Sequence, residues 1–336
     1  MIRIGILGIG FMGVTHFKAI QKVRGAKVVA VCTRDRSKLS GDWRRVQGNF
    51  GGSGGVQNLE AVARYREVDA LIGDPNVDLV DICLPTPMHY DVCTAALTAG
   101  KHVLVEKPIS LSPRQADRML ETARKKKRLL MVAHVLRFFP EFRLIKELLE
   151  CRDHGKIQAM HMKRIISKPS WREPKENGGP AIDLHIHDVD FLQYLLGLPA
   201  AVTSSGYLGR GGLVEYLHTQ YDYAGRGIAV SAESGWLSQA GCPFEHGYDV
   251  YFENATLKFN SSSGNPPQLL TKDGKTRRPR LTVRDGFVAE LQEAVDSVQN
   301  GKPSRIIGGQ SARNSIAICL KEIESAQKGR RVRIGK

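Results

Sequence analysis

Hydrophobic runs of strand length alternate with amphipathic stretches of helix length through the first 135 residues. The pattern predicts strands before residue 8 and at residues 26–32, 77–84, 102–106 and 129–134, and helices at residues 14–23, 59–72, 90–99 and 113–127. Such an alternation with short breaks is typical of a parallel sheet covered by helices on both faces. We therefore predict a doubly wound α/β domain over residues 1–135.

The second half of the chain follows a different pattern. From residue 201 to about residue 259 the residues tend to alternate with period two, as at Val230, Ala232 and Trp236. This period predicts an antiparallel sheet with one covered face. Further strands are expected at residues 156–166 and at the C-terminus, and helices at residues 141–150, 181–196, 285–299 and 310–327. Residues 136–336 are therefore predicted to form an α+β domain with a mostly antiparallel sheet.

The first predicted strand ends in glycines spaced G-x-G-x-x-G. Gly8 permits a tight turn, Gly10 lets the main chain approach a pyrophosphate, and Gly13 lets the following helix lie close to the strand. The helix N-terminus would offer free N–H groups and a positive dipole end to the anion. A dinucleotide site is predicted here, and an ordinary glycine-containing turn is the alternative. The predicted contacts are Gly8, Ile9, Gly10, Phe11, Met12 and Gly13.

Composition indicates a soluble protein of two domains. The chain has 336 residues, of which 42% are hydrophobic and 25% charged, and no apolar run reaches the roughly 18 residues of a membrane span. The cysteines show no C-x-x-C pairing, which is typical of reduced thiols. We therefore expect a cytoplasmic protein with no membrane partner. The cysteines are Cys32, Cys83, Cys93, Cys151, Cys242 and Cys319.

The formal net charge of +15 raises the question of nucleic-acid binding. The basic residues gather in segments 124–128, 275–280 and 328–336. These segments lack interleaved aromatic residues, a zinc-finger spacing and a recognition helix. A solvated basic surface is therefore favoured over a nucleic-acid site, and attraction of a phosphate-bearing cofactor is an intermediate alternative.

Three local features point to proton-transfer chemistry. Glu106, Lys107 and Pro108 stand at the carboxyl end of a predicted parallel strand, where ligands bind in open α/β sheets. Asp183 and His187 lie four residues apart on a predicted helix, so their side chains are expected to share one face. A lysine, an aspartate and a histidine brought together could transfer protons beside a nicotinamide.

The run from Asp183 to Asp188 also has the composition of a metal site, because it includes His185 and His187. Residues two apart on a helix point away from each other. His185 is therefore not expected to join Asp183 and His187 in one ligand set, and no metal site is predicted. The role of His185 stays open.

The order of these motifs resembles the Gfo/Idh/MocA family, which includes glucose-fructose oxidoreductase and inositol 2-dehydrogenase. The resemblance covers essentially the whole chain, and it also extends to residues 85–89 and 99–108. It implies an N-terminal Rossmann domain and a C-terminal domain with an open-faced sheet that carries the substrate. The implied activity is NAD(P)-dependent oxidation or reduction of a sugar, a cyclitol or a related polyol.

Carried over by position, the resemblance implies Lys107, Asp183 and His187 as the catalytic group. His187 would take the hydroxyl proton as hydride leaves, Asp183 would orient the imidazole, and Lys107 would stabilise the alkoxide. The structural alternatives are a surface ion pair for Lys107, a helix start for Asp183 and a core position for His187. A catalytically silent, nucleotide-binding sensor of the same fold is the alternative function.

The end of the second predicted strand bears on the choice of cofactor. An NAD-preferring fold places an acid about 20 residues beyond the glycines, whereas Thr33 and Arg34 stand there in this chain. Thr33 can bond a 2′-phosphate and Arg34 can pair with it, which favours NADP over NAD. Asp35 is the nearby acid that could reverse this preference. The other predicted cofactor contacts are Leu84, Pro85, Thr86, His89, Glu106 and Lys107.

Substrate and partner contacts carry weaker sequence signals. Arg137, Trp171 and Arg172 are the candidate substrate-side residues, and each could equally serve packing or the surface. The glycine-rich residues 48–55 are expected in a loop near the adenosine end of the cofactor. A sheet that leaves an apolar face uncovered predicts self-association into a homodimer or homotetramer.

Overall fold

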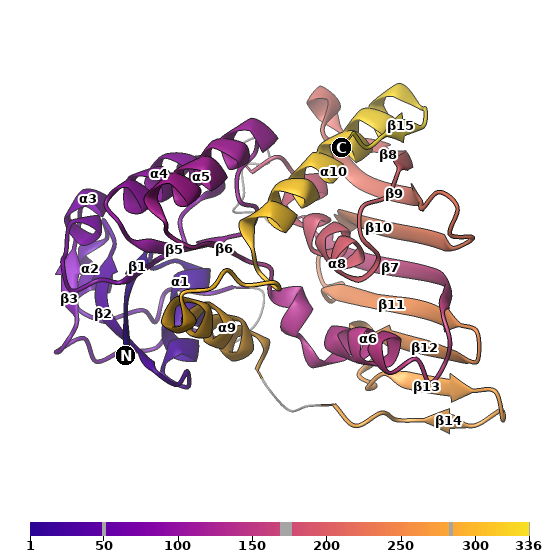
Figure 1. The fold of residues 1–336 in the computed structure, drawn as a ribbon, viewed down its shortest axis with the longest axis horizontal. Helices are drawn as coiled ribbons and strands as arrows, with labels where there is room; N and C mark the ends of the chain where they lie inside the picture. Colours follow the sequence, from indigo (N-terminus) through magenta and orange to yellow (C-terminus); the bar gives the residue numbers. More distant parts are fainter. Residues whose placement is uncertain (49–51, 169–176, 282–284, 336) are drawn as a thin grey trace. The chain divides into compact units, whose positions relative to one another are not determined.

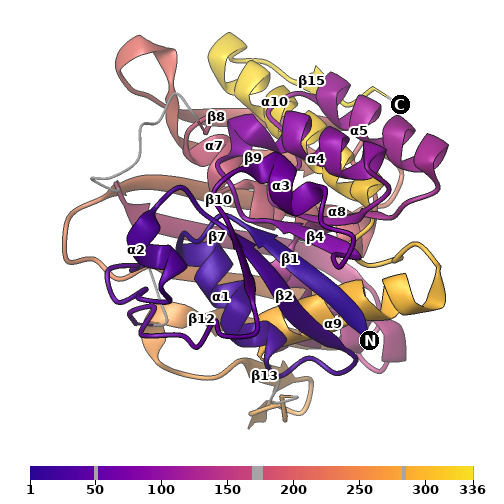
Figure 2. The same cartoon turned by 90° about the vertical axis from the view of Figure 1, so that its left-hand side faces the viewer.

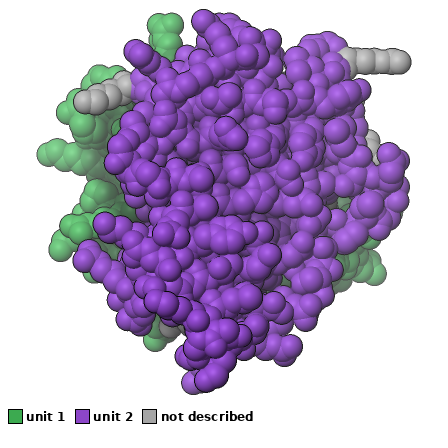
Figure 3. Space-filling view, turned by 90° about the vertical axis from the view of Figure 1, so that its right-hand side faces the viewer, with its two compact units in different colours: residues 1–135, 285–313 green, residues 136–284, 314–336 purple. Residues whose placement is uncertain are grey.

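A computed structural model describes residues 1–48, 52–168, 177–281 and 285–335. The chain divides into two compact units, which Figure 3 distinguishes by colour. Unit 1 consists of Met1–Val135 and Asp285–Arg313, and unit 2 consists of Leu136–Arg284 and Asn314–Lys336. A segment that the sequence analysis places in the second domain therefore returns to unit 1.

Unit 1 is built on a parallel sheet (Figures 1 and 2). Its strands are β1 (Ile2–Leu7), β2 (Ala26–Cys32), β3 (Ala63–Tyr65), β4 (Leu79–Ile82), β5 (His102–Glu106) and β6 (Leu130–Ala133). The strand order is β3-β2-β1-β4-β5-β6. The central strands are near-continuous apolar runs because helices bury both faces, as the fully buried Ile4, Val80 and Leu104 show.

Helices cover both faces of this sheet. The helices α3 (Val68–Ile72), α4 (His89–Thr98) and α5 (Pro113–Lys126) lie on one face, whereas α1 (Phe11–Ile20) and α9 (Gly286–Asn300) lie on the other (Figure 1). The short helix α2 (Arg36–Leu39) follows β2. This arrangement confirms the predicted Rossmann fold of the N-terminal part.

Two segments of unit 1 differ from the sequence prediction. Residues 59–72 do not form one helix, because Ala63–Tyr65 pairs with β2 as the edge strand β3 and only Val68–Ile72 is helical. A strand pairing of this kind depends on the neighbouring strand rather than on the local pattern. The helix α9 packs against α1, and its Gln299 donates to the carbonyl oxygen of Gly25.

Unit 2 is built on a larger sheet. Its strands are β7 (Ile157–Ser167), β8 (Ala201–Leu208), β9 (Val214–Asp222), β10 (Ala229–Ser238), β11 (Glu245–Phe252), β12 (Ala255–Asn260), β13 (Gln268–Thr271), β14 (Thr276–Arg277) and β15 (Val332–Arg333). The strand order is β14-β13-β12-β11-β7-β10-β9-β8-β15. The pair β7 and β10 is parallel and the other neighbouring pairs are antiparallel, which confirms the predicted mostly antiparallel sheet.

Helices cover one face of the second sheet. These are α6 (Pro140–Cys151), α8 (Ile186–Leu196) and the part of α10 (Gly309–Lys328) that belongs to unit 2 (Figure 1). Phe142 of α6 meets the rings of Phe191 and Tyr248 edge-on, each at a centroid distance of 5.4 Å. None of the described helices is long and apolar enough to span a membrane.

The opposite face of the second sheet carries mixed side chains. Strand register places Lys163, Glu233 and Asp249 on this outer face, in the central strands. Large exposed hydrophobic side chains are scattered among them, one on each of four strands: Tyr207, Leu237, Tyr251 and Leu270. The premise that this sheet leaves an apolar face uncovered is therefore wrong.

Candidate functional site

The turn between β1 and α1 requires glycine at two fingerprint positions. Gly8 has a φ of +94°, and a Cβ there would lie 2.6 Å from the carbonyl oxygen of Cys83. A Cβ on Gly13 would overlap the carbonyl oxygen of Gly8. A Cβ on Gly10, in contrast, would meet no described atom within 4 Å. The open side of Gly10, at the start of α1, would give a pyrophosphate access to main-chain N–H groups.

A cavity of about 570 Å³ lies beside this turn in unit 1. The predicted cofactor contacts that line it are Gly8, Thr33, Arg34 and Leu84. Arg66 and Glu67, which were not predicted from the sequence, also line the cavity. They follow β3, so recognising that strand would have placed them at the carboxyl edge of the sheet, where ligands bind.

Asp35 is occupied in capping the helix that follows β2. Its Oδ1 accepts the main-chain N–H of Ser37 at 2.9 Å and the hydroxyl of Ser37 at 2.7 Å. The hydrogen bond from the Ser37 side chain is the main cause that lowers the pKa of Asp35. This carboxylate is therefore engaged as the α2 N-cap.

His89 joins two loops at the carboxyl edge of the sheet. The ring is buried, with Nδ1 2.8 Å from the carbonyl oxygen of Pro108 and Nε2 2.8 Å from that of Leu84. Burial lowers the pKa of His89, although both carbonyls favour the charged ring. Both ring nitrogens thus face the protein, and His89 supports the loops after β4 and β5 that carry other predicted contacts.

His16 forms a buried polar cluster that the sequence analysis missed. Its Nδ1 lies 2.9 Å from Oδ2 of Asp81 in β4, and its Nε2 lies 3.2 Å from Oε1 of Glu106 at the end of β5. The other oxygen of Glu106 accepts the main-chain N–H of Lys107 at 3.0 Å. An acid inside the apolar run 77–84 is the signal that could have revealed the cluster, because a buried carboxylate needs a partner.

The cluster includes atoms of the kinds that bind metals. Among the described residues, ligand atoms of His16, Asp81 and Cys83 lie within 4.8 Å of one another. Burial opposes a charge on the His16 ring, but Asp81 and Cys83 together outweigh it and raise the pKa of His16 well above 6.5. An imidazolium can donate from Nδ1 to Asp81 and can pair through its charge with Glu106. We therefore interpret the cluster as a buried ion-pair network.

The helix predicted at residues 181–196 is broken within the motif that holds Asp183 and His187. The helix α7 (Pro180–Asp183) ends at Asp183, and α8 begins at Ile186. The main-chain N–H of His187 lies 3.4 Å from the carbonyl oxygen of Leu184, three residues back. Asp183 and His187 are partly buried, whereas His185 is fully buried. The expectation of one continuous helix is therefore wrong.

The other predicted residues fall in different places. Lys107 belongs to unit 1, whereas Asp183 and His187 belong to unit 2, and their joint action stays a prediction. Arg137 is buried and binds both carboxylate oxygens of Asp190, at 2.7 and 2.6 Å. This pairing indicates a structural role, and a substrate role for Arg137 stays a prediction. Trp171 and Arg172 lie outside the described residues.

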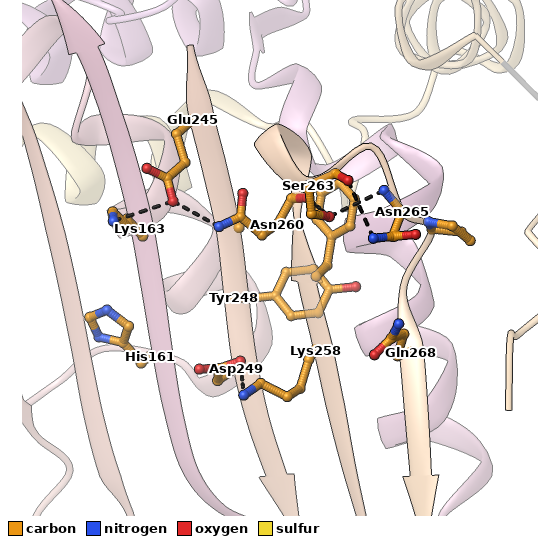
Figure 4. Close-up of a pocket in the computed structure, with 13 residues that line it drawn as sticks. His161, Lys163, Glu245, Tyr248, Asp249, Lys258, Asn260, Ser263, Asn265 and Gln268 are labelled. Carbon is orange, nitrogen blue, oxygen red and sulfur yellow. Dashed lines mark hydrogen bonds and ion pairs between the residues drawn. The ribbon is translucent and has the colours of Figure 1, made fainter. Parts of the chain in front are cut away.

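A basin of about 440 Å³ lies on the outer face of the second sheet (Figure 4). Its lysines are paired with acids: Lys163 lies 3.3 Å from Oε1 of Glu245, and Lys258 lies 3.5 Å from Oδ1 of Asp249. Asn260 also donates to Glu245, at 2.7 Å. Because these charges are balanced within the basin, it offers no excess of positive charge for a phosphate.

Family models match both parts of the chain. Residues 2–134 match the model described as "Oxidoreductase family, NAD-binding Rossmann fold", and residues 142–258 match "GFO/IDH/MocA C-terminal domain". The chain belongs to the Gfo/Idh/MocA family. The predicted family is therefore confirmed, and the chain is an oxidoreductase with an NAD-binding Rossmann domain.

Relatives of this Gfo/Idh/MocA protein include dehydrogenases of cyclitols. Myo-inositol 2-dehydrogenase of Thermotoga maritima is 26% identical over 326 residues, which cover 91% of each chain. Inositol 2-dehydrogenase of Rhizobium meliloti is 27% identical over 305 residues, which cover 87% of this chain and 85% of the relative.

Solved structures share the whole fold. An oxidoreductase from Agrobacterium radiobacter, in complex with NAD+, L-tartaric acid and magnesium, has a TM-score of 0.83 at 20% identity and matches 99% of this chain and 98% of its own. Levoglucosan dehydrogenase, in complex with NADH and levoglucosan, has a TM-score of 0.81 at 18% identity and matches 100% of both chains. These likenesses show that the two-part fold is that of the family.

Proposed function

We propose that this protein is an NADP-preferring dehydrogenase that transfers hydride between the cofactor and a sugar, cyclitol or related polyol, or its keto form. The observation that carries the proposal is the glycine turn, open at Gly10 and beside a cavity lined by Thr33 and Arg34, in a member of this family. The names of the inositol and levoglucosan dehydrogenases support the polyol class of substrate.

The chain's own residues fit an NADP cofactor. The main chain of the turn at residues 8–13 would bind the pyrophosphate, and Arg34 with Arg66 would pair with a ribose 2′-phosphate. Asp35, the acid that would favour NAD, is engaged with Ser37. Three acids, Glu67, Asp69 and Asp91, also line the cavity, and their charges oppose a phosphate. The nicotinamide, when bound, supplies the hydride acceptor or donor.

Lys107, Asp183 and His187 would perform the proton chemistry. A neutral imidazole on His187 can take the hydroxyl proton during oxidation and return it during reduction. Asp183 would orient that ring and stabilise its charged form, and the Lys107 ammonium would stabilise negative charge on the substrate oxygen. The assignment of these roles follows the family motif at each position.

A substrate screen tests the proposal. Sugars, cyclitols and their keto forms would be assayed with NADP or NAD in both oxidised and reduced form, with the absorbance of the reduced nicotinamide as the readout. We expect turnover of at least one polyol, with a higher kcat/KM for NADP than for NAD. Binding of NADP without turnover of any compound would instead favour the nucleotide-binding sensor.

A further inference from the structure

His185 lies between Asp183 and His187, at the break between α7 and α8, and is fully buried in unit 2. Its Nδ1 lies 2.7 Å from the hydroxyl of Ser234 in β10. Its Nε2 lies 3.3 Å from Oε1 of Glu322 in α10 and 3.1 Å from the hydroxyl of Tyr221 in β9. One side chain therefore connects the break to two strands and a second helix.

The hydrogen-bond donors around His185 indicate a ring that carries two protons. Ser234 donates its single hydroxyl hydrogen to Oδ2 of Asp188 at 3.3 Å, so its oxygen is left to accept from Nδ1 of His185. At Nε2 a Glu322 carboxylate can only accept, and the Tyr221 hydroxyl can give its hydrogen to that carboxylate and accept from the ring. In this arrangement both ring nitrogens face acceptors, and an imidazolium satisfies both.

The buried charges of this region balance when His185 is charged. Arg164 of β7 binds Asp188 of α8 through two hydrogen bonds of 2.9 Å, which leaves the fully buried Glu322 without that cation. Burial, the largest effect, disfavours the charged ring, but Glu322 and Asp188 together outweigh it and raise the pKa of His185. Arg164 opposes this rise. The other titratable groups around Glu322 are Tyr221, Tyr223 and Cys319.

The main-chain hydrogen bonds at the break depart from the regular helical pattern from His185 onward. The N–H groups of Leu184 and His185 both bond to the carbonyl oxygen of Pro180, at 3.0 and 2.9 Å. The N–H of Asp188 and the N–H of His187 bond three residues back, to the carbonyl oxygens of His185 and Leu184, at 3.0 and 3.4 Å. At this irregular stretch of backbone, the side chain of His185 ties the segment to β9, β10 and α10, and Asp188 adds contacts to β7 and β10.

We propose that His185 and Glu322 form a buried ion pair that fixes the break between α7 and α8 and thereby positions His187 for proton transfer. His185 is a positioning residue, because its ring nitrogens face protein groups. The positioning part of this inference rests on the proposed function, whereas the ion pair does not.

Paired substitutions test the ion pair by urea unfolding. Glu322→Gln and His185→Gln each leave one buried charge without its partner, whereas the double variant removes both charges. We expect the double variant to unfold at a higher urea concentration than the Glu322→Gln variant. The matched control is Glu324→Gln, two residues further along α10, where a partly exposed acid pairs with Lys321 and Lys328. It should change the midpoint little because the charges of these pairs remain in contact with solvent. A double variant no more stable than Glu322→Gln would overturn the ion pair.

NMR of the ¹⁵N-labelled histidine rings tests the positioning of His187. Signals are assigned with His185→Gln and His187→Gln. We expect the His185 ring to carry two protons at about pH 8. In Glu322→Gln the ring should lose its second proton at a lower pH, with a midpoint at a proton concentration at least tenfold higher. The ring signal of His187 should shift in that variant and in the double variant, but not in Glu324→Gln. A His185 ring with one proton at about pH 6 would contradict the ion pair, and an unmoved His187 signal would contradict the positioning role.

These outcomes are separable from the fate of the proposed function. The NADP dissociation constant should be the same in Glu322→Gln and in the unmodified protein, because the predicted cofactor contacts belong to unit 1. Failure of the unmodified protein to turn over any polyol would remove the proposed activity and leave the unfolding and NMR results standing.

Discussion

Nε2 of His16 lies 3.2 Å from Oε1 of Glu106. The contact joins α1, which begins at the glycine turn, to the strand end that precedes Lys107. Because the second oxygen of Glu106 accepts the N–H of Lys107, the main chain of the predicted catalytic lysine is tied to the helix of the predicted cofactor site. This network has consequences for stability that depend on pH.

Replacement of His16 should destabilise the protein most at mildly acidic pH. The folded state raises the pKa of His16 above 6.5. The contribution of the charged His16 to the free energy of unfolding is therefore fully present below pH 6.5 and is lost as the pH rises through the raised pKa. For Glu106, burial alone would raise the pKa, but His16 outweighs it and lowers the pKa below 4.5. The contribution of Glu106 is therefore lost only as the pH falls through that lowered value.

The contributions of His16 and Glu106 to stability are thus both fully present from about pH 4.5 to 6.5. His16→Asn should lower the free energy of unfolding there by about 3 to 5 kcal/mol, as for one partner of a buried pair, and by less at alkaline pH. Urea unfolding at about pH 6 and about pH 9 measures the difference, with His154→Asn as the control. An equal loss at both pH values would show that His16 is not charged in the folded protein.

Cofactor preference should depend on the two arginines that line the unit 1 cavity. Arg34→Ala and Arg66→Ala should each weaken NADP binding by about 10-fold or more and change NAD binding little, because NAD lacks the 2′-phosphate. Dissociation constants from nicotinamide fluorescence measure this. Arg118→Ala, on an exposed position of α5, is the matched control. Equal or better kcat/KM with NAD in the unmodified protein would overturn the preference.

Substitution of the proposed proton-transfer residues should remove turnover and spare the cofactor. His187→Ala should lower kcat by about 10² to 10⁴, the usual cost of a lost general base. Lys107→Ala should also lose most turnover, and Asp183→Asn should lose less because it keeps the shape of the side chain. Steady-state kinetics on a substrate from the screen, with NADP affinity measured in parallel, provide the test. Near-normal turnover by His187→Ala would show that another group takes the proton.

Self-association through the outer face of the second sheet stays a prediction. The scattered apolar side chains of this face include Tyr251, which is 41% exposed, and an interface there would bury it among paired charges. Tyr251→Lys should therefore reduce the mass measured by light scattering at micromolar concentration. Leu198→Lys, at a 49% exposed hydrophobic residue of the α8–β8 loop, is the matched control. A single-chain mass for the unmodified protein would rule the prediction out.

Much of the fold was predictable because its signals are local. The glycine spacing at residues 8–13, the apolar run at residues 102–106 and the glycine at residue 100 after a helix each depend on side chains close in sequence. These signals place the Rossmann strands and the turn that would bind a pyrophosphate. The motif around Asp183 and His187 was likewise visible as a spacing of residue types.

The tertiary structure decided what depends on distant partners. The edge strand β3 exists because Ala63–Tyr65 pairs with β2, and α9 returns to unit 1 because it packs against α1. The charge of His16 depends on Asp81 and Glu106, and that of His185 on Glu322, which lies 137 residues away. Hydrogen bonding and charge balance in a buried site are set by the groups that folding brings together, so the pattern along the chain identified these histidines as residue types but not their roles.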